Sequence, residues 1–176
     1  MFRAALVSWL ALTTVWFSSV VFSQDAPGAA PPVVKIGVYE SRAIAVAWAA
    51  SKYNPVSEKM QEMAEAKKAN DARRVAQLET WGQTQQQRLH FQGFGRVPVS
   101  DLLQPVHQEM RQLMRDKGLV AITMQCDVAL EGVELIDVTM DLVQFYSPSV
   151  QTLNWIRQLG DREPLPLDEL AKLPAR

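Results

Sequence analysis

The chain has 176 residues, of which 48% are hydrophobic and 21% are charged, which fits one folded domain with a short appendage and excludes two full domains. Its formal net charge of −1 excludes a general electrostatic attraction to nucleic acid or to anionic lipid. Cys126 is the one cysteine, which excludes an internal disulfide, so stability in an oxidising compartment has to come from packing or from oligomerisation.

The first 23 residues have the order of a secretory signal peptide. One arginine precedes an uncharged apolar run from Ala4 to Ser23, and cleavage is expected after Ser23. The alternative is a retained membrane anchor, because the run is just long enough to span a bilayer. Serine and threonine within the run and the lack of a basic flank after it favour cleavage. We therefore expect an exported protein, with residues 24–32 as a flexible leader.

The stretch from residue 33 to residue 91 predicts a strand and two helices. Residues 33–39 (VVKIGVY) are rich in β-branched side chains, and residues 40–54 are rich in helix formers. From Val56 to about Phe91 the pattern predicts one long helix, whose apolar stripe is thin and consists largely of alanine. Such a helix buries too little to be the centre of a globular core, so we expect a solvated arm that packs against one partner helix.

Beyond the break at Gly93–Pro98, another helix is expected from about Ser100 to Lys117, with a slight kink at Pro105. Its apolar residues form a narrow seam suited to a helix–helix contact, and Gly118 is expected to cap it. Two strands and a short helix are expected to follow, over residues 119–125, 128–139 and 140–146. Residues 147–176 are interpreted as a Pro-punctuated C-terminal extension without an assigned function.

The sequence is poor in catalytic signals. It lacks a Gly-rich phosphate loop, an HExxH motif, a paired-cysteine metal spacing and a GxSxG elbow. Cys126 with His107 or His90 would make a thiol–imidazole pair, an enzyme hypothesis that the local sequence does not support. Four acidic residues between 127 and 137 do not have the spacing of a calcium loop and resemble the solvent-facing side of a strand. We therefore predict no catalytic residue, no metal and no cofactor.

Large apolar side chains gather on the expected arm, which is too polar to bury all of them. One interpretation is that they pack across the hairpin. The other is an adaptable surface for apolar segments of other chains, because flexible methionine side chains suit varied partners. The candidate contact residues are Met60, Met63, Leu78, Trp81, Phe91 and Phe94.

Three stretches, in this order, resemble the Skp/OmpH family of periplasmic chaperones. VVKIGVYESRAI is similar to the family's opening strand and turn, LLQPVHQEMRQLMRDKGLVAI to its return helix and next strand, and VELIDVTMDLVQFY to its closing segment. The matching order extends over residues 33–146. The resemblance implies an α+β fold, in which a small β-sheet body formed from both ends of the chain carries a protruding long α-helical hairpin arm over about residues 55–117.

The resemblance also implies a function. Family members are trimers whose arms enclose a cavity that holds unfolded outer-membrane proteins without ATP. We therefore expect a periplasmic homotrimer that binds unfolded outer-membrane or envelope proteins through the six candidate residues, with no nucleic-acid partner. The alternative is a scaffolding protein of the same fold that docks one fixed partner. The best-known members are strongly basic and this chain is not, which argues against lipopolysaccharide binding.

Overall fold

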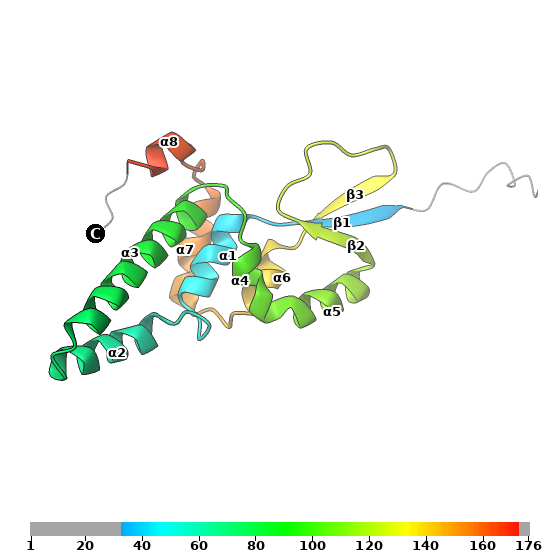
Figure 1. Ribbon diagram of the computed structural model, residues 1–176. Helices are drawn as coiled ribbons and strands as arrows, with labels where there is room; N and C mark the ends of the chain where they lie inside the picture. The colour runs from blue at the N-terminus through cyan, green and yellow to red at the C-terminus, as the bar shows by residue number, and fades with distance from the viewer. Residues whose placement is uncertain (1–32, 173–176) are drawn as a thin grey trace, which may run out of the picture. The chain divides into compact units, whose positions relative to one another are not determined.

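The computed structural model describes residues 33–172, which contain a three-stranded sheet (Figure 1). β1 (Val34–Val38) lies between β2 (Leu119–Thr123) and β3 (Val133–Asp137), and both neighbours run parallel to it. The expected α+β fold is therefore corrected to an α/β fold. The apolar pattern located the three strands, but their directions depend on pairings between distant parts of the chain, which no local pattern encodes.

One face of the sheet packs against the hydrophobic core. At Gly37 in the central strand, a Cβ atom would lie only 3.0, 3.1 and 3.2 Å from the side chains of Leu119, Ile122 and Val138. A larger residue would push these side chains apart, because protein cores have almost no free space. Glycine therefore allows the close approach of the core to the central strand.

Within residues 33–172 the opposite face of the sheet is only partly covered, and we call it the open face. In Figure 1, helix α5 (His107–Lys117), which packs against β2, lies on one side of the sheet, and the connection 124–132 arches over the other side. Val34 and Leu135 are 39% and 45% exposed, and Val120, which lies at an irregularity in the pairing of β1 with β2, is 63% exposed. Parallel sheets are normally covered on both faces, so this apolar surface is unusual.

Helix α1 (Ser41–Ala49) occupies the centre of the helical part. Its N-terminus is capped by the Glu40 carboxylate, which accepts a hydrogen bond from the main-chain N–H of Arg42. Four helices pack against α1: α3 (Ala72–Phe94), α4 (Ser100–Leu103), α6 (Thr139–Gln144) and α7 (Val150–Gly160). The large apolar side chains that are almost fully buried are Ile44, Val99, Leu102, Val106, Val138, Leu142, Val143 and Leu170.

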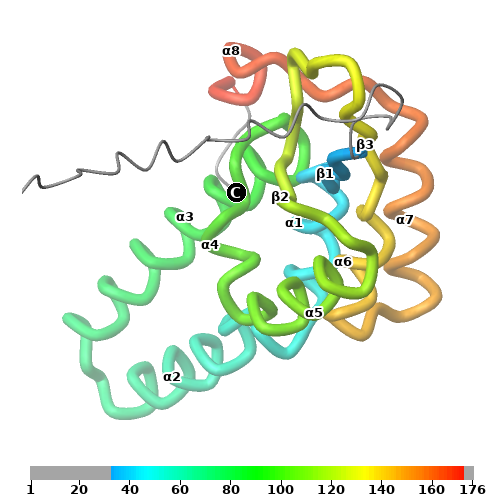
Figure 2. Tube along the Cα trace, turned by 90° about the vertical axis from the view of Figure 1, so that its right-hand side faces the viewer, coloured from blue at the N-terminus to red at the C-terminus, as the bar shows by residue number. Residues whose placement is uncertain are grey.

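The single helix expected from Val56 to Phe91 is wrong. The chain forms two helices instead, α2 (Val56–Lys68) and α3, which pack against each other as a hairpin (Figure 2). Asn70 between them has a left-handed backbone conformation with φ 53°, and the Asp71 carboxylate accepts a 2.9 Å hydrogen bond from the N–H of Arg74. Short amide and carboxylate side chains favour such turns and caps, because they bond to nearby main-chain groups.

The arm expected over residues 55–117 is also corrected, because no long helical hairpin arm is evident in the part of the chain that the structure describes. Helix α3 returns to pack against α1, and the segment after it enters the core, where Leu103 and Val106 are buried. Met110 and Leu113 of α5 also pack against the core. The seam that suggested a helix–helix contact is thus the core-facing side of the segment from α4 to α5.

Pro105 interrupts the helix expected from about Ser100 to Lys117 instead of kinking it slightly. The segment divides into α4, a 3-10 turn over Gln104–Val106 and α5. The turn brings the N–H of His107 to the carbonyl of Gln104, three residues earlier, which suits a stretch where proline has removed one α-helical donor. The predicted cap at Gly118 is confirmed: its φ of 65° ends α5 in the left-handed conformation.

The last third of the described chain contains an element that the sequence did not predict. Helix α7 begins after Ser149, whose hydroxyl accepts a 3.1 Å hydrogen bond from the N–H of Thr152, and Ile156 in this helix is buried against the core. The predicted strand over residues 128–139 is shorter, since only β3 forms there. Helix α8 (Leu167–Leu170) follows within the Pro-punctuated extension.

Among residues 33–172, no helix is long and apolar enough to cross a membrane. The predicted signal peptide at residues 1–23 and the leader at residues 24–32 lie outside the described residues.

Candidate functional site

An apolar groove lies between α2 and α3. It has a volume of about 580 Å³. Within α2 only Ala66 is buried, so the larger side chains of this helix are left to border the groove or to face solvent. The apolar residues that border it come from both helices: Val56, Met60, Met63, Leu78, Trp81 and Leu89.

A second apolar depression, of about 320 Å³, continues along α3 as far as α7. Leu89 and His90 border both hollows, so together they form one surface, which we call the α3 trough. The remaining apolar border of the second depression comes from three helices: Ala45, Val46 and Ala49 of α1, Gly93 and Phe94 of α3, and Trp155 and Leu159 of α7.

The α3 trough brings together most of the residues that the sequence singled out. Met60, Met63, Leu78 and Trp81 border the groove between α2 and α3, and Phe94 borders the second depression. Phe91 borders neither hollow. Leu78 is buried and contributes to packing, whereas Met60 and Phe94 are 68% and 45% exposed and are accessible to another molecule.

Sequence reasoning missed the part of the trough that α7 supplies. Trp155 is 50% exposed, and Leu159 lies four residues further along the same helix, so both face the trough. A signal for this helix was present in Ser149, which stands where a capping residue is expected before apolar residues at helical spacing.

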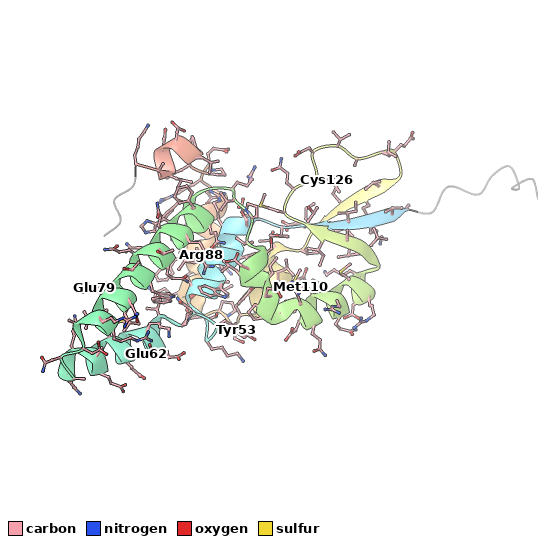
Figure 3. All side chains as sticks on the ribbon, viewed as in Figure 1. Tyr53, Glu62, Glu79, Arg88, Met110 and Cys126 are labelled. Carbon is pink, nitrogen blue, oxygen red and sulfur yellow. The ribbon has the colours of Figure 1, made fainter. Side chains whose placement is uncertain are left out.

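The charged residues near the groove are largely paired with each other. Lys59 donates a 2.5 Å hydrogen bond to Glu62, and Arg74 of α3 donates to the same carboxylate. These bonds from Lys59 and Arg74 lower the pKa of Glu62, which therefore stays ionised at neutral pH. In Figure 3, Glu62 and Glu79 lie on the hairpin of α2 and α3. Glu79 also borders the groove, and its negative charge balances the second positive charge of the group, so the groove is an apolar surface with little net charge.

A separate polar cavity of about 330 Å³ lies where the three strands end. Glu40, Arg96, Cys126 and Asp137 all border it. The Cys126 thiol donates a 3.4 Å hydrogen bond to the carbonyl of Val128 in the same loop. Neither of the two histidines considered as partners for this cysteine borders the cavity. In the part of the chain that the structure describes, no three His, Cys, Asp or Glu side chains are grouped closely enough to hold a metal ion.

The Glu40 carboxylate in this polar cavity joins several segments. Its side chain accepts hydrogen bonds of 3.1 Å from two guanidinium nitrogens of Arg42, and a third nitrogen of Arg42 donates a 2.7 Å bond to the carbonyl of Arg162, beyond α7. Burial works to raise the pKa of Glu40, but the hydrogen bonds from Arg42 and the positive charges of Arg42 and Arg96 outweigh it and lower the pKa. Glu40 and Arg42 together therefore link the start of α1 to Arg162, just beyond α7.

No model of a known protein family matches the chain, and comparisons with curated proteins and with solved structures found no match either. The resemblance to the Skp/OmpH family stays a prediction that rests on the three quoted motifs. The α3 trough is a well-defined apolar hollow of the size of known binding pockets, and it is therefore the candidate binding site.

Proposed function

We propose that this protein is an exported, ATP-independent holdase that binds unfolded outer-membrane or envelope proteins. The observation that carries the proposal is the α3 trough, an accessible apolar surface with methionine and tryptophan side chains at its border. Its two hollows, of about 580 and 320 Å³, have the size of binding pockets for short segments or small molecules. Flexible methionines can adapt to apolar side chains of different shapes.

Weak binding at each trough suits a holdase. A single trough covers only a short part of an unfolded chain, so one contact is readily released. Several copies of the protein on one client, or several troughs in one assembly, raise the overall affinity through effective concentration. Such binding prevents aggregation of the client and still lets it leave for folding elsewhere.

We further propose that copies of the chain associate through the open face of the sheet, as the homotrimer that the resemblance implies. Val34 and Leu135 make this face apolar, and Val128 and Leu130 in the connection over it are 87% and 82% exposed. Burial of this surface against other copies would remove it from water and cover the sheet on both sides. Association would also place several troughs in one particle.

A direct experiment tests the holdase proposal. A β-barrel outer-membrane protein unfolded in urea is diluted into buffer without ATP, and light scattering is followed with and without this protein. We expect near-stoichiometric amounts to suppress the scattering, and an inert protein of similar size to leave it unchanged. Full aggregation in the presence of this protein would overturn the proposal. If it then retained one partner reproducibly in a pull-down, the scaffolding alternative would be favoured.

A further inference from the structure

Gln85 is a buried amide with an unused donor at the border of the groove between α2 and α3. The residue is only 8% exposed, and its Nε2 atom has no hydrogen-bond partner. A buried N–H group without an acceptor destabilises a protein, and native structures contain few of them. An acceptor supplied by a ligand in the groove would remove that cost.

A chain of hydrogen bonds fixes which way the Gln85 amide points. Arg88 donates a 2.8 Å bond from Nη2 to the Oε1 atom of Gln85 and a 2.7 Å bond from Nη1 to the Asp101 carboxylate (Figure 3 labels Arg88). The same carboxylate accepts a 2.9 Å bond from Gln92. Because arginine has only donors, the amide atom that faces Arg88 has to be the oxygen. The NH₂ group of Gln85 is therefore the unpaired one.

We propose that the NH₂ group of Gln85 donates a hydrogen bond to a main-chain carbonyl of an extended, uncharged polypeptide segment seated in the groove. This inference rests on the proposed function and names the contact by which the groove distinguishes a polypeptide from other apolar ligands. The Nε2 atom itself is buried, so the side-chain amide has to turn about its terminal torsion when a ligand binds, and that torsion has a broad energy well in glutamine.

The surroundings of Gln85 favour a polypeptide over an acyl chain. An extended segment has unpaired carbonyl groups between its side chains, whereas an acyl tail has no acceptor that could enter an apolar groove. Gln83 and Gln86 also border the groove, so further neutral amides are available for main-chain groups. Lys59 is paired with Glu62 there, and Glu79 adds a negative charge at the border, so an anionic headgroup is not attracted.

The substitution Gln85→Met tests the inference, because methionine has a similar length and no donor. Two probes are titrated by fluorescence: a labelled short peptide of alternating valine and threonine, and the neutral dye N-phenyl-1-naphthylamine, which has no carbonyl. We expect the peptide Kd to rise about three- to tenfold, as for one lost hydrogen bond, and the dye Kd to stay unchanged. The thermal unfolding temperature should change little, because removal of the unpaired donor offsets the loss of the hydrogen bond from Arg88 to Oε1.

Gln87→Met is the matched control, because Gln87 is exposed on the same helix and does not border the groove. It should bind both probes as the wild type does. Gln85→Glu keeps an oxygen for Arg88 and lacks the donor, so it should also bind the peptide more weakly. Unchanged peptide affinity in both Gln85 variants would overturn this inference and leave the holdase proposal standing. A wild-type protein that binds neither the peptide nor an unfolded β-barrel protein would overturn both.

Discussion

The hydroxyl of Tyr146 donates a 2.9 Å hydrogen bond to the main-chain carbonyl of Leu102. This bond joins the end of α6 to α4 beside the 3-10 turn that contains Pro105. Burial raises the pKa of Tyr146, with smaller contributions from Tyr53, Tyr39 and Asp101, so the hydroxyl remains a donor at neutral pH. The bond thereby links the end of α6 to α4, just before the 3-10 turn that separates α4 from α5.

Replacing Tyr146 with phenylalanine should destabilise the fold by about 1–2 kcal/mol, because the buried carbonyl of Leu102 loses this donor. The edge-to-face contact with Tyr53, whose ring centroid lies 6.0 Å away, is retained in the variant. Urea unfolding followed by circular dichroism measures the difference. Tyr53→Phe is the control, since it keeps both the ring contact and the bond to Leu102. Equal losses in the two variants would contradict the role given to the Tyr146 hydroxyl.

Glu40 should make the stability depend on pH in the acidic range. Its pKa is lower in the folded protein than the ordinary value of 4.5, so its stabilising contribution is complete above that value. The contribution is lost as the pH falls through the lowered pKa, because the protonated side chain no longer pairs with Arg42. Urea unfolding at neutral pH and at several values below 4.5 should show this decline.

The variant Glu40→Gln should cost about 1–3 kcal/mol at neutral pH, because it leaves the guanidinium of Arg42, whose side chain is only 4% exposed, without its charged partner. Its free energy of unfolding should also fall less than that of the wild type as the pH is lowered. Glu163→Gln, at an exposed position, is the matched control and should leave the free energy of unfolding unchanged. If the free energy of unfolding fell as steeply with acid in Glu40→Gln as in the wild type, the pH dependence would come from other groups.

Changing Met60 to serine should weaken client binding and leave the fold intact. The residue is 68% exposed, so the free energy of unfolding should change by no more than about 0.5 kcal/mol. Suppression of aggregation should then need a higher ratio of protein to client. Met140→Ser is the control, because Met140 is 42% exposed on α6 and lies outside the α3 trough. Equal loss of activity in both variants would show that the trough has no special role.

The proposed association through the open sheet face predicts a trimer that a charge on this face disrupts. Light scattering coupled to gel filtration should give the mass of a trimer for the chain without residues 1–23. Leu135→Lys, at a position that is 45% exposed on the open face, should lower that mass toward the monomer. Val150→Lys, at a position that is 75% exposed at the start of α7, should leave the mass unchanged. A wild-type monomer would contradict the proposed assembly.

Much of the fold could be predicted from local sequence patterns. The β-branched run in β1, the helix formers of α1 and the glycine at position 118 each predicted the element that the structure shows. The break at Asn70 also had a local signal, because asparagine followed by a capping aspartate is typical of a turn. The alanine-rich pattern on both sides of it nevertheless suggested one continuous helix. The parallel order of the strands had no local signal, since it depends on long-range pairing.

The candidate site was predictable only in part, for a related reason. Met60, Met63 and Trp81 stood out because the segment that carries them is otherwise polar. The contribution of Trp155 required knowing that α7 packs on α1 and reaches the side of α3, which is a tertiary fact. The unpaired amide of Gln85 could not be inferred either, because burial in a polar stretch of helix follows from the packing of α3 and not from its sequence period.

The central place of β1 in the sheet has a consequence for how the protein is made. Its first strand in sequence, Val34–Val38, can pair only with strands that begin at Leu119 and Val133. Contacts between such distant segments slow folding, because a long loop has to close first. During synthesis from the N-terminus, β1 stays unpaired at least until the residues of β2 have been made. A chain truncated before Leu119 therefore has neither partner strand for β1, and it should fail to form the sheet.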